Sequence, residues 1–380
     1  MNKRIAVIGG GIGGLCTGLA LQKQGIEVSI YEKQGQFHGA GAGIVLGGNA
    51  LRALDYLGVG EQIREASFST NQCTIYSELG KKLTVLDYKS DSLPNYTFIH
   101  RHDLVKILAE AIEPSSVIYN KKLVQLVQRE NYTIQLCFED GSEEQTNFLI
   151  ASDGIHSFVR KQLLPHKQLR FAGYTCWRGI IENCPDSIPK AFTETWGPKG
   201  RFGIVPLSNN RIYWYALKNG QANDSELTKW KVKDLLYNFM AYHDPIPRVL
   251  ERTDDKNVIR HDIYDLDPLF RYNFGNIILL GDAAHATTPN MGQGACQAIE
   301  DALSLALCFE KEKEINNVFI KYEEQRLDRS RKIIQESRLA GKIAQIDIPF
   351  LCSIRNQMLK LTPSTVYHSR LKNLFEIQTK

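Results

Sequence analysis

Long apolar runs are absent from this 380-residue chain. No stretch reaches the roughly 18 apolar residues that a membrane-spanning helix needs, so we expect no integral membrane segment. The eight cysteines are scattered, with no Cys-x-x-Cys pair and no spacing typical of metal ligands. We therefore expect no metal site and no redox-active cysteine pair, and the thiols fit a reducing cytoplasm.

An excess of one charge sign is also missing. The formal net charge is +4, from 46 basic and 42 acidic residues, and no dense basic run occurs. This balance argues against nucleic acid as a partner. With 43% hydrophobic and 23% charged residues, the composition is that of a soluble globular protein. At this length we expect two domains and a large core.

The first informative stretch lies at the start of the chain. Ile5–Ile8 predicts a short buried strand, and small and apolar residues after a glycine turn predict a helix. Three glycines fill the G-x-G-x-x-G pattern, which serves a tight turn, close approach of a pyrophosphate and close packing of helix on strand. The pyrophosphate would lie on free N–H groups at the helix start. The turn residues expected at a dinucleotide are Gly9, Gly11, Ile12, Gly13 and Gly14.

The residues after this helix support the same interpretation. Glu27–Tyr31 predicts a second strand, and Glu32 ends it, where a carboxylate can accept both ribose hydroxyls of an adenosine. The acid argues against a 2′-phosphate on the bound dinucleotide, although Lys33 beside it weakens that argument. Strand, glycine turn, helix, strand and acid in this order predict a Rossmann-like α/β fold and not a signal peptide.

A glycine-rich loop at 39–48 and a short helix at 49–58 follow. The loop is not a second dinucleotide fingerprint, because its glycines fall at the wrong spacing. It either packs on itself or lets a flat ligand lie against its backbone, and the residues leave both readings open.

Strands are then predicted at 73–76 and 83–86, and 99–104 opens a helix. Asp103 lies in the first turn of that helix, where it can cap the turn or complement the helix dipole. Arg101 at the same helix start is either a solvated side chain or a clamp for a phosphate or carboxylate.

A second informative stretch is Phe148–Arg160, in which a buried strand leads into Asp153 and Gly154. Taken alone, an Asp-Gly pair after a strand is only a turn. Further strands are predicted before this stretch, at 117–120, 123–128 and 132–139.

Residues 169–275 are rich in strand patterns and aromatic side chains. The clearest element is a hairpin over 201–217 with an Asn209-Asn210 turn. Alternation along its second strand puts Tyr213 and Tyr215 on one face and Trp214 on the other. Core packing is the default role for each aromatic residue, and substrate contact is the alternative. The candidate substrate contacts in this region are Arg178, Phe202 and Tyr215.

The third informative stretch is Asn276–Asp301, in which a buried strand ends at Gly281 and Asp282. A loop then leads into a helix of small residues, whose first N–H groups could stabilise an electron-rich ligand. His285 has no partner at a useful spacing, so we interpret it as a structural histidine. A long charged helix over 315–345 and a second helical run after Pro349 complete the chain.

Together the three stretches resemble the single-component flavoprotein aromatic hydroxylases, which include salicylate hydroxylases, zeaxanthin epoxidases and tetracycline-inactivating monooxygenases. The resemblance covers Ile5 to about Gln345. It implies that FAD is held by the glycine turn, by Glu32 with Lys33, and by the motifs that contain Arg101, Asp153 and Asp282. The remaining FAD contacts implied by the resemblance are Leu123, Gly281, Pro289, Gly292, Gln293 and Gly294. Asn290 and Met291 are candidate substrate contacts in the same loop.

The family also implies the chemistry. NADPH or NADH reduces the flavin, O₂ adds to form a C4a-hydroperoxide, and one oxygen passes to an electron-rich aromatic or polycyclic substrate. No catalytic base can be assigned from the sequence. Arg178 could pair a substrate carboxylate or merely anchor the sheet.

Two alternative functions remain at this point. One is a flavin-dependent reductase or dehydrogenase of the same fold without oxygen transfer, and the other is a flavin-binding protein without turnover. We expect a discontinuous FAD domain, a β-sheet substrate domain and a C-terminal helical segment. Their ranges are 1–70, 100–170 and 275–345 for the first, 71–99 and 171–274 for the second, and 346–380 for the third. Oligomeric state cannot be predicted.

Overall fold

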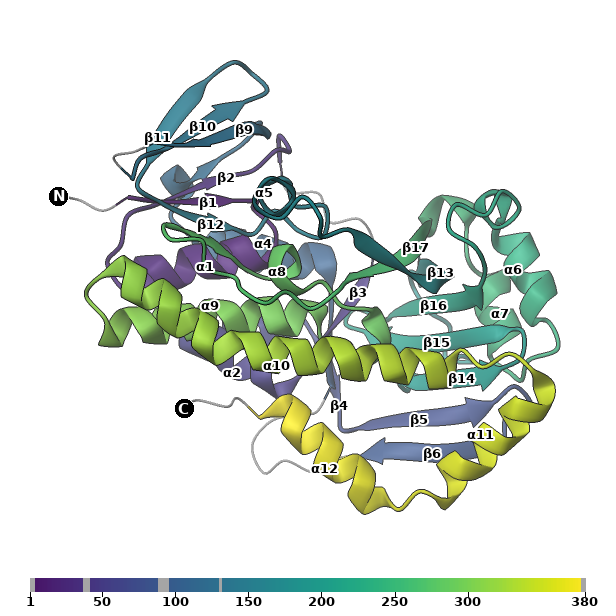
Figure 1. The fold of residues 1–380 in the computed structure, drawn as a ribbon. Coiled ribbons are helices and arrows are strands. Elements are labelled where there is room, and N and C mark those ends of the chain that lie inside the picture. The colour runs from purple at the N-terminus through teal and green to yellow at the C-terminus, as the bar shows by residue number, and fades with distance from the viewer. Residues whose placement is uncertain (1–3, 37–41, 88–95, 130–131, 377–380) are drawn as a thin grey trace.

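A computed structural model describes residues 4–36, 42–87, 96–129 and 132–376. Its centre is a five-stranded parallel sheet with strand order β18-β12-β1-β2-β8 (Figure 1). The apolar runs predicted as strands are buried along their length, as expected for a parallel sheet covered on both faces. The strands are β1 (Ile5–Ile8), β2 (Val28–Tyr31), β8 (Val117–Ile118), β12 (Phe148–Ala151) and β18 (Ile277–Leu279).

Helices cover this sheet in layers. The helix after the glycine turn is apolar on all sides because it is enclosed by the sheet and by neighbouring helices. At Gly18 an added Cβ would lie 2.5 Å from Ile112 Cδ1 and 2.6 Å from Ile30 Cδ1, so a larger residue would force both side chains to shift. The helices around the sheet are α1 (Ile12–Lys23), α2 (Gly48–Tyr56), α3 (Gly60–Glu65), α4 (Arg101–Ala111), α5 (Phe158–Leu163), α8 (Asp282–His285), α9 (Gly294–Lys311) and α10 (Ile315–Ala344).

A small antiparallel sheet with strand order β11-β10-β9 lies beside the parallel sheet (Figure 1). Its hairpin turns at Asp140-Gly141, where Gly141 has a φ of +82°. Its first strand begins three residues after Asn120, whose N–H donates to the carbonyl oxygen of Gln34. The strands are β9 (Leu123–Gln128), β10 (Ile134–Phe138) and β11 (Glu143–Thr146), preceded by the short helix η1 (Pro114–Ser116).

The second large layer is a seven-stranded sheet with order β17-β13-β16-β15-β14-β5-β6. It contains β5 (Gln72–Ser77), β6 (Lys82–Asp87), β13 (Leu169–Ile181), β14 (Thr193–Gly197), β15 (Gly200–Leu207), β16 (Arg211–Asn219) and β17 (Val258–Leu266). The connecting helices are η2 (Leu227–Lys229), α6 (Val232–Phe239), α7 (Ile246–Glu251) and η3 (Asp255–Asn257). The sequence pattern did not predict α7, which begins one residue after Pro245.

The two faces of this sheet have different surroundings. One face packs against α6 and α7 and buries Trp177 and Trp214. The other face carries Tyr213 and Tyr215, which belong to a separate apolar cluster with Phe98, Ile333 and Phe375. This confirms the predicted alternation in the Asn209-Asn210 hairpin. Both turn residues have positive φ, 59° and 56°, as asparagine tolerates.

A third, three-stranded sheet with order β3-β7-β4 joins the two large layers. Its strands are β3 (Gly43–Leu46), β4 (Phe68–Thr70) and β7 (Tyr96–His100). We expected residues 71–99 in the substrate domain. Of this range, β5 and β6 lie in the seven-stranded sheet. The expected boundary at residue 99 falls inside β7. The glycine-rich loop that we predicted at 39–48 lies partly outside the described residues, and its described part contains β3 and the first residue of α2.

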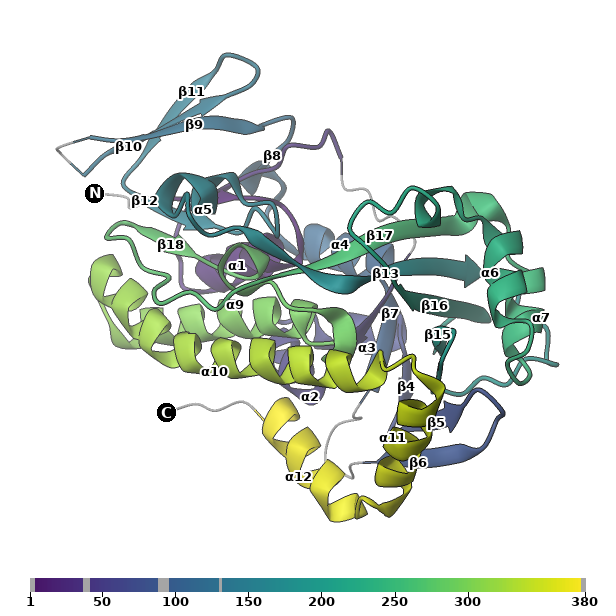
Figure 2. The same ribbon diagram turned by 45° about the vertical axis from the view of Figure 1, so that its right-hand side comes forward.

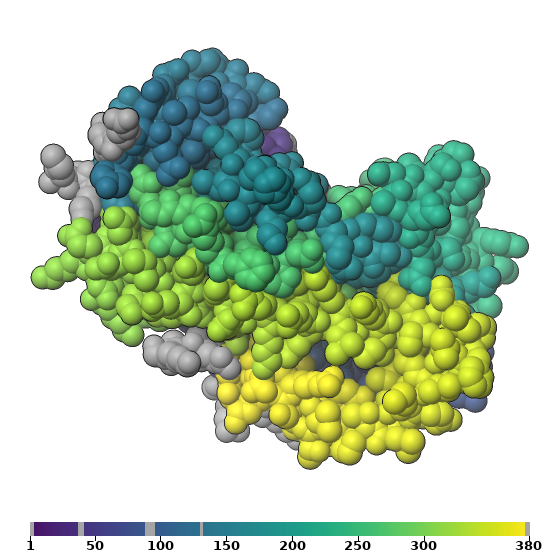
Figure 3. Space-filling view, in the orientation of Figure 1, coloured from purple at the N-terminus to yellow at the C-terminus, as the bar shows by residue number. Residues whose placement is uncertain are grey.

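The predicted long helix is α10, which runs along both layers (Figures 1 and 2). It is followed by α11 (Pro349–Leu361) and α12 (Ser364–Phe375), both of which pack against β6. Figure 3 shows these two helices on the outer surface, with a hollow between them and α10. Across the described residues, no helix is both long and apolar enough to cross a membrane.

Candidate functional site

Three motifs meet at one edge of the parallel sheet. Strands β2, β1, β12 and β18 are parallel neighbours, so their carboxyl ends lie side by side. The residues that follow these ends include Glu32, Gly9, Asp153 and Asp282. Ligands of open α/β sheets bind outside this edge. The three stretches that the sequence singled out are thereby brought together.

The glycine turn has the geometry that its pattern predicts. Gly9 has a φ of +101°, and a Cβ there would overlap the carbonyl oxygen of Ser152. A Cβ at Gly14 would overlap the carbonyl oxygen of Gly9, and one at Gly13 would lie 2.8 Å from Ser152 Oγ. Gly11 differs, because no atom of the described residues lies within 4 Å of its Cβ position. Open space in front of Gly11 fits close approach of a pyrophosphate.

Glu32 lies beside the turn. Its Oε2 accepts a hydrogen bond from the Gly10 N–H at 2.7 Å, and its Oε1 accepts one from the Gln34 N–H at 2.9 Å. Each carboxylate oxygen keeps a lone pair for a ribose hydroxyl. Lys33 is exposed, and Leu123 is buried at the start of β9, two residues after a backbone hydrogen bond from Lys121 to Glu32. The roles expected for these residues stay predictions.

The Asp-Gly motif caps the start of the short helix α5. Asp153 Oδ2 accepts a hydrogen bond from the Val159 N–H at 3.1 Å, and the Ser157 hydroxyl accepts one from the Arg160 N–H. Asp153 Oδ1 is buried and has no partner in the described part of the chain. Desolvation raises the pKa of Asp153 by more than the hydrogen bonds from Ser157 and Val159 lower it. The motif therefore has a structural use and leaves one carboxylate oxygen unsatisfied.

Arg160 is a residue whose role the sequence did not indicate. Its buried guanidinium donates to the carbonyl oxygens of Ile155, Asp282 and Ala283, at 2.5, 3.3 and 3.1 Å. It thereby joins the Asp153 loop to the start of α8. The sequence feature that could have indicated this role is the position of a cationic side chain directly after the apolar pair Phe158-Val159.

Asp301 holds the Gly281-Asp282 turn from behind. Its Oδ2 accepts hydrogen bonds from the Gly281 N–H at 2.8 Å and His285 Nε2 at 2.6 Å, and its Oδ1 accepts one from Arg326 Nε at 2.6 Å. Desolvation pushes the pKa of Asp301 upward, but His285 and Arg326 outweigh it and hold that pKa below the usual range. We predicted a structural histidine without a partner. His285 is buried, and its partner is Asp301, sixteen residues along the chain.

Asp282 is different from the carboxylates around it. Solvent reaches its side chain, and no donor to its carboxylate is found among the described residues. Desolvation by the surrounding protein nonetheless raises its pKa, while His285, Arg101 and Arg160 act against that shift. A Cβ at Gly294 would lie 4.0 Å from Asp282 Oδ1. Asp282 thus projects between the start of α9 and Arg101 without a fixed protein partner.

The loop before α9 presents backbone toward the same edge. It contains η4 (Pro289–Met291) and Gly292, which has a φ of +63° and would overlap Val45 if it carried a Cβ. Gln293 is buried and accepts hydrogen bonds from Asn49 at 3.2 Å and Gln297 at 2.9 Å. Its side chain is thus used inside the protein, and only backbone of the 292–294 segment is left to face a cofactor.

Asn290 ties this loop to other elements. Its Nδ2 donates to Tyr174 Oη, Thr288 Oγ1 and the Ser337 carbonyl oxygen, and its Oδ1 accepts from Arg201 at 2.8 Å. The amide nitrogen has no hydrogen left for a substrate. We therefore treat Asn290 as a residue that positions the loop, in place of the substrate contact that we expected.

The sheet face toward this loop carries the other expected substrate residues. Arg178 lies beside Cys176 and Tyr213, and Met291 packs against the same apolar cluster as Tyr215. No carboxylate lies within ion-pair distance of Arg178 in the described part of the chain. Burial raises the pKa of Tyr213, although the Arg178 guanidinium favours the ionised phenol.

Phe202 does not lie on that face. Its ring is buried on the opposite side of the sheet, 5.5 Å from the rings of Trp214 and Phe239. It belongs to the core under α6 and α7 because alternation along β15 sends Phe202 away from its neighbour Arg201. This position does not support the expected substrate contact, and we leave Phe202 out of the proposed site.

A buried ion pair on the loop-facing side was missed by the sequence analysis. Arg201 pairs with Glu194, and the same carboxylate accepts hydrogen bonds from Tyr215 Oη at 2.9 Å and Trp196 Nε1 at 2.7 Å. Burying an ion pair requires such additional hydrogen bonds. In the sequence, alternation along β15 indicates the face on which Arg201 lies. It does not indicate which of the two neighbouring strands carries the acidic partner.

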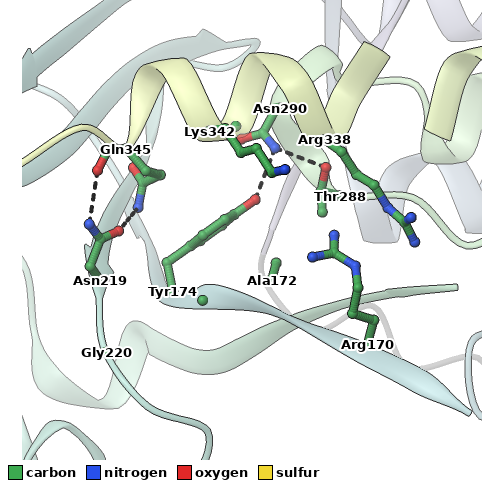
Figure 4. A pocket seen from close by; sticks show the side chains of 12 residues that line it. Arg170, Ala172, Tyr174, Asn219, Gly220, Thr288, Asn290, Arg338, Lys342 and Gln345 are labelled. Carbon is green, nitrogen blue, oxygen red and sulfur yellow. Dashed lines mark hydrogen bonds between the residues drawn. The ribbon is translucent and has the colours of Figure 1, made fainter. Parts of the chain in front are cut away.

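A separate cavity of about 290 Å³ lies between β13 and the end of α10, and Asn290 forms part of its wall (Figure 4). Arg170 and Arg338 point into it, but both pair with Asp265, which neutralises part of their charge. Among the expected site residues, only Asn290 lines this cavity. We therefore do not assign the substrate to it.

The fold and this sheet edge define a dinucleotide-binding α/β protein, and the family and relatives of the chain make it an FAD-dependent flavoprotein of the monooxygenase class. Residues 2–337 match the FAD binding domain family, and the chain belongs to that family. FAD is its cofactor. The open space at Gly11 and the unpartnered Asp153 oxygen fit such a ligand. Across the described residues, no group of three or more His, Cys, Asp or Glu side chains could hold a metal ion.

Known relatives are FAD-dependent oxidoreductases. The chain is 33% identical over 373 residues to an aurachin C monooxygenase/isomerase of Stigmatella aurantiaca, covering 97% of this chain and 96% of the relative. It is similar to the solved structure of Klebsiella pneumoniae HpxO with FAD and uric acid, with a TM-score of 0.87, 26% identity and coverage of 98% and 96%. It shares its fold with a salicylate hydroxylase substrate complex, at a TM-score of 0.80, 23% identity and coverage of 98% and 95%. The family resemblance inferred from the three motifs is confirmed.

Proposed function

We propose that this protein is a monooxygenase that uses NADPH or NADH and O₂ to hydroxylate an aromatic or polycyclic small molecule. One oxygen atom enters the substrate, the other leaves as water, and the nicotinamide cofactor supplies the two electrons. Bound FAD supplies the oxygen-activating chemistry, and the protein supplies binding, orientation and electrostatics. The relatives are named for aurachin C, uric acid and salicylate, which supports a small-molecule substrate.

The residues assigned to FAD follow the sheet edge. Gly11 admits the pyrophosphate and Glu32 takes the adenosine ribose, with Leu123 near the adenine. Asp282 has a carboxylate that is free to accept hydroxyl hydrogens of the ribityl or ribose, and Arg101 neutralises negative charge beside it. Backbone N–H groups at the start of α9 stabilise negative charge that develops on an electron-rich ring.

The substrate assignment rests on the position and the unpaired charge of Arg178. This residue is a cation without an ion-pair partner in the described residues, on the sheet face that meets the 289–294 loop. Desolvation lowers the pKa of Arg101, and the charge of Arg178 lowers it further. The two guanidinium groups therefore face a common region. We infer that Arg178 pairs a carboxylate, phenolate or carbonyl oxygen of the substrate, with Tyr213 and Tyr215 beside the ring.

Substrate-dependent oxygen uptake tests this proposal. The holoenzyme is supplied with NADPH or NADH and a panel of aromatic compounds with and without an acidic group, and product mass is recorded. The expected result is NAD(P)H oxidation stimulated by an acidic aromatic compound, with a product heavier by one oxygen. NAD(P)H-dependent reduction of the compound without oxygen uptake would instead establish a reductase. Bound flavin with no stimulated turnover would leave a binding protein.

A variant pair tests the role of Arg178. Arg178→Gln should raise KM for an acidic substrate by about ten- to a hundredfold, because a charge-assisted hydrogen bond is lost. Arg178→Lys should keep part of the affinity. Equal KM values in all three proteins would show that Arg178 merely anchors the sheet.

We also place the protein in a reducing compartment such as the cytoplasm. All eight cysteines are free, and seven of them are buried. Buried thiols that form no disulfide are typical of proteins that fold in reducing surroundings. Cell fractionation with an epitope-tagged chain would test this location.

A further inference from the structure

Helix α11 exposes an apolar face. Its five outward side chains are between 41% and 80% exposed, which is unusual for so many large apolar groups on one short helix. At about 100° per residue, they fall within a single arc of about 100°. These residues, here called the α11 stripe, are Phe350, Leu351, Ile354, Met358 and Leu361.

The opposite side of α11 is fixed to the protein. Arg355 is buried, donates to the carbonyl oxygens of Ala344 at 3.2 Å and Trp196 at 3.4 Å, and lies over the Trp196 ring at 5.4 Å. Leu359 packs against the apolar cluster that contains Trp196 and Leu83. Because these contacts set the rotation of the helix, the α11 stripe cannot turn inward to be buried.

The chain segment that carries the stripe has charges of one sign. Acidic residues number 42 in the whole chain, yet none lies between Ile348 and Phe375. Lys360 and Arg370 are exposed in the same segment, whereas Lys372 is exposed and pairs with Glu376 at 3.9 Å. An outward apolar face flanked by basic side chains is typical of a helix that lies in the plane of a membrane interface. Figure 2 shows α11 and α12 at one end of the molecule.

We propose that α11 docks on the surface of a bilayer containing anionic lipid, with the α11 stripe in the acyl boundary and the basic side chains at the phosphates. Charge favours this occupant over a second copy of the chain. A symmetric contact between two stripes would bring the same patch of each copy together, and with it the same unbalanced positive charges. A phosphate-rich surface complements those charges and is worth about a fivefold gain in affinity per basic residue.

Vesicle flotation of the holoenzyme tests the proposal, and it needs no turnover. The wild type should float with vesicles of phosphatidylcholine and phosphatidylglycerol in equal parts, and about tenfold less with phosphatidylcholine alone. The double variant Phe350→Ser/Met358→Ser should lose about tenfold or more of the binding to the anionic vesicles. Lys360→Gln should lose about fivefold on the anionic vesicles alone.

A matched control is available at the C-terminal end of α6. Tyr237 and Met240 are also highly exposed, at 80% and 62%. Tyr237→Ser/Met240→Ser should bind vesicles like the wild type, and thermal unfolding should show that both double variants are folded. Failure of the wild type to float, or equal binding by the two double variants, would overturn the proposal. A dimer in light scattering that only Phe350→Ser/Met358→Ser dissociates would overturn it in favour of a second copy.

Discussion

Two strand-turn-helix units face the proposed flavin position, and they are held in different ways. The first runs from β1 through Gly9 and Gly11 into α1. The second runs from β18 through Gly281 and Asp282 toward α9. In the first unit the backbone is fixed by contacts that only glycine permits, between Gly14 and Gly9 and between Gly9 and Ser152. In the second unit the turn is fixed by side chains from distant elements.

The polar contacts of the second unit cover long separations. Asp301 on α9 and Arg326 on α10 hold the Gly281 turn and His285, and Arg160 reaches the carbonyl oxygen of Asp282. Buried polar groups hold a unique geometry only when every member is satisfied. The first unit should therefore fail through steric clash, and the second through unpaired charge.

The largest effect is expected from Gly14→Ala. The new Cβ would overlap the carbonyl oxygen of Gly9, which is backbone and cannot move aside without separating α1 from β1. We expect a loss of about 4 kcal/mol or more in the free energy of unfolding, measured by urea denaturation. Gly11→Ala is the control and should unfold like the wild type or slightly later. Equal stability of the two variants would contradict steric control of this unit.

Arg326→Met should cost nearly as much for the opposite reason. The variant removes a buried cation from both Glu300 and Asp301, which keep only Arg329 and His285, and removing one partner of a buried pair costs about 3 to 5 kcal/mol. Arg331→Met on the same helix is the control. Arg331 forms a surface pair with Asp328 and lies 6.0 Å from the exposed Phe270 ring, so we expect a change within about 0.5 kcal/mol. A similar loss in both variants would mean that helix propensity, and not the network, sets the effect.

Acid should weaken the second unit through Asp301. The folded-state pKa of Asp301 lies below its unfolded-state value of about 3.9. Its contribution to stability is therefore complete above that value and is lost as the pH falls through the folded-state pKa. We expect Asp301→Asn to be less stable at neutral pH and to lose less stability between neutral pH and pH 3. Parallel stability-pH curves for the two proteins would contradict this.

The sequence predicted the first unit and most secondary structure because the determining signals are local. Glycine spacing, apolar runs and the Asn209-Asn210 turn each act over a few residues. The same signals indicated that Glu32, Asp153 and Asp282 follow buried strands, and the parallel sheet brings them to one edge. Their contacts with FAD stay predictions of the family resemblance.

The second unit could not be predicted because its contacts depend on tertiary packing. Nothing in the spacing of His285 and Asp301 shows that a loop returns His285 to the side of α9. Likewise, alternation placed Phe202 on one of two faces, and only the position of α6 and α7 decides which face is the core. Glu194 and Arg201 are paired across neighbouring strands, a register that no local pattern specifies.

The central claim is that FAD lies between the two units, and the flavin content of Gly11→Val tests it most directly. Gly11 has a φ of −73° and a ψ of −173°, a conformation that valine adopts readily, and beyond its chain neighbours no described atom lies within 4 Å of the Cβ position. The purified wild type should be yellow, with flavin absorbance that reports about one FAD per chain. Gly11→Val should be folded like the wild type yet nearly colourless, as should Asp282→Ala. A folded Gly11→Val protein with full flavin absorbance would contradict the account.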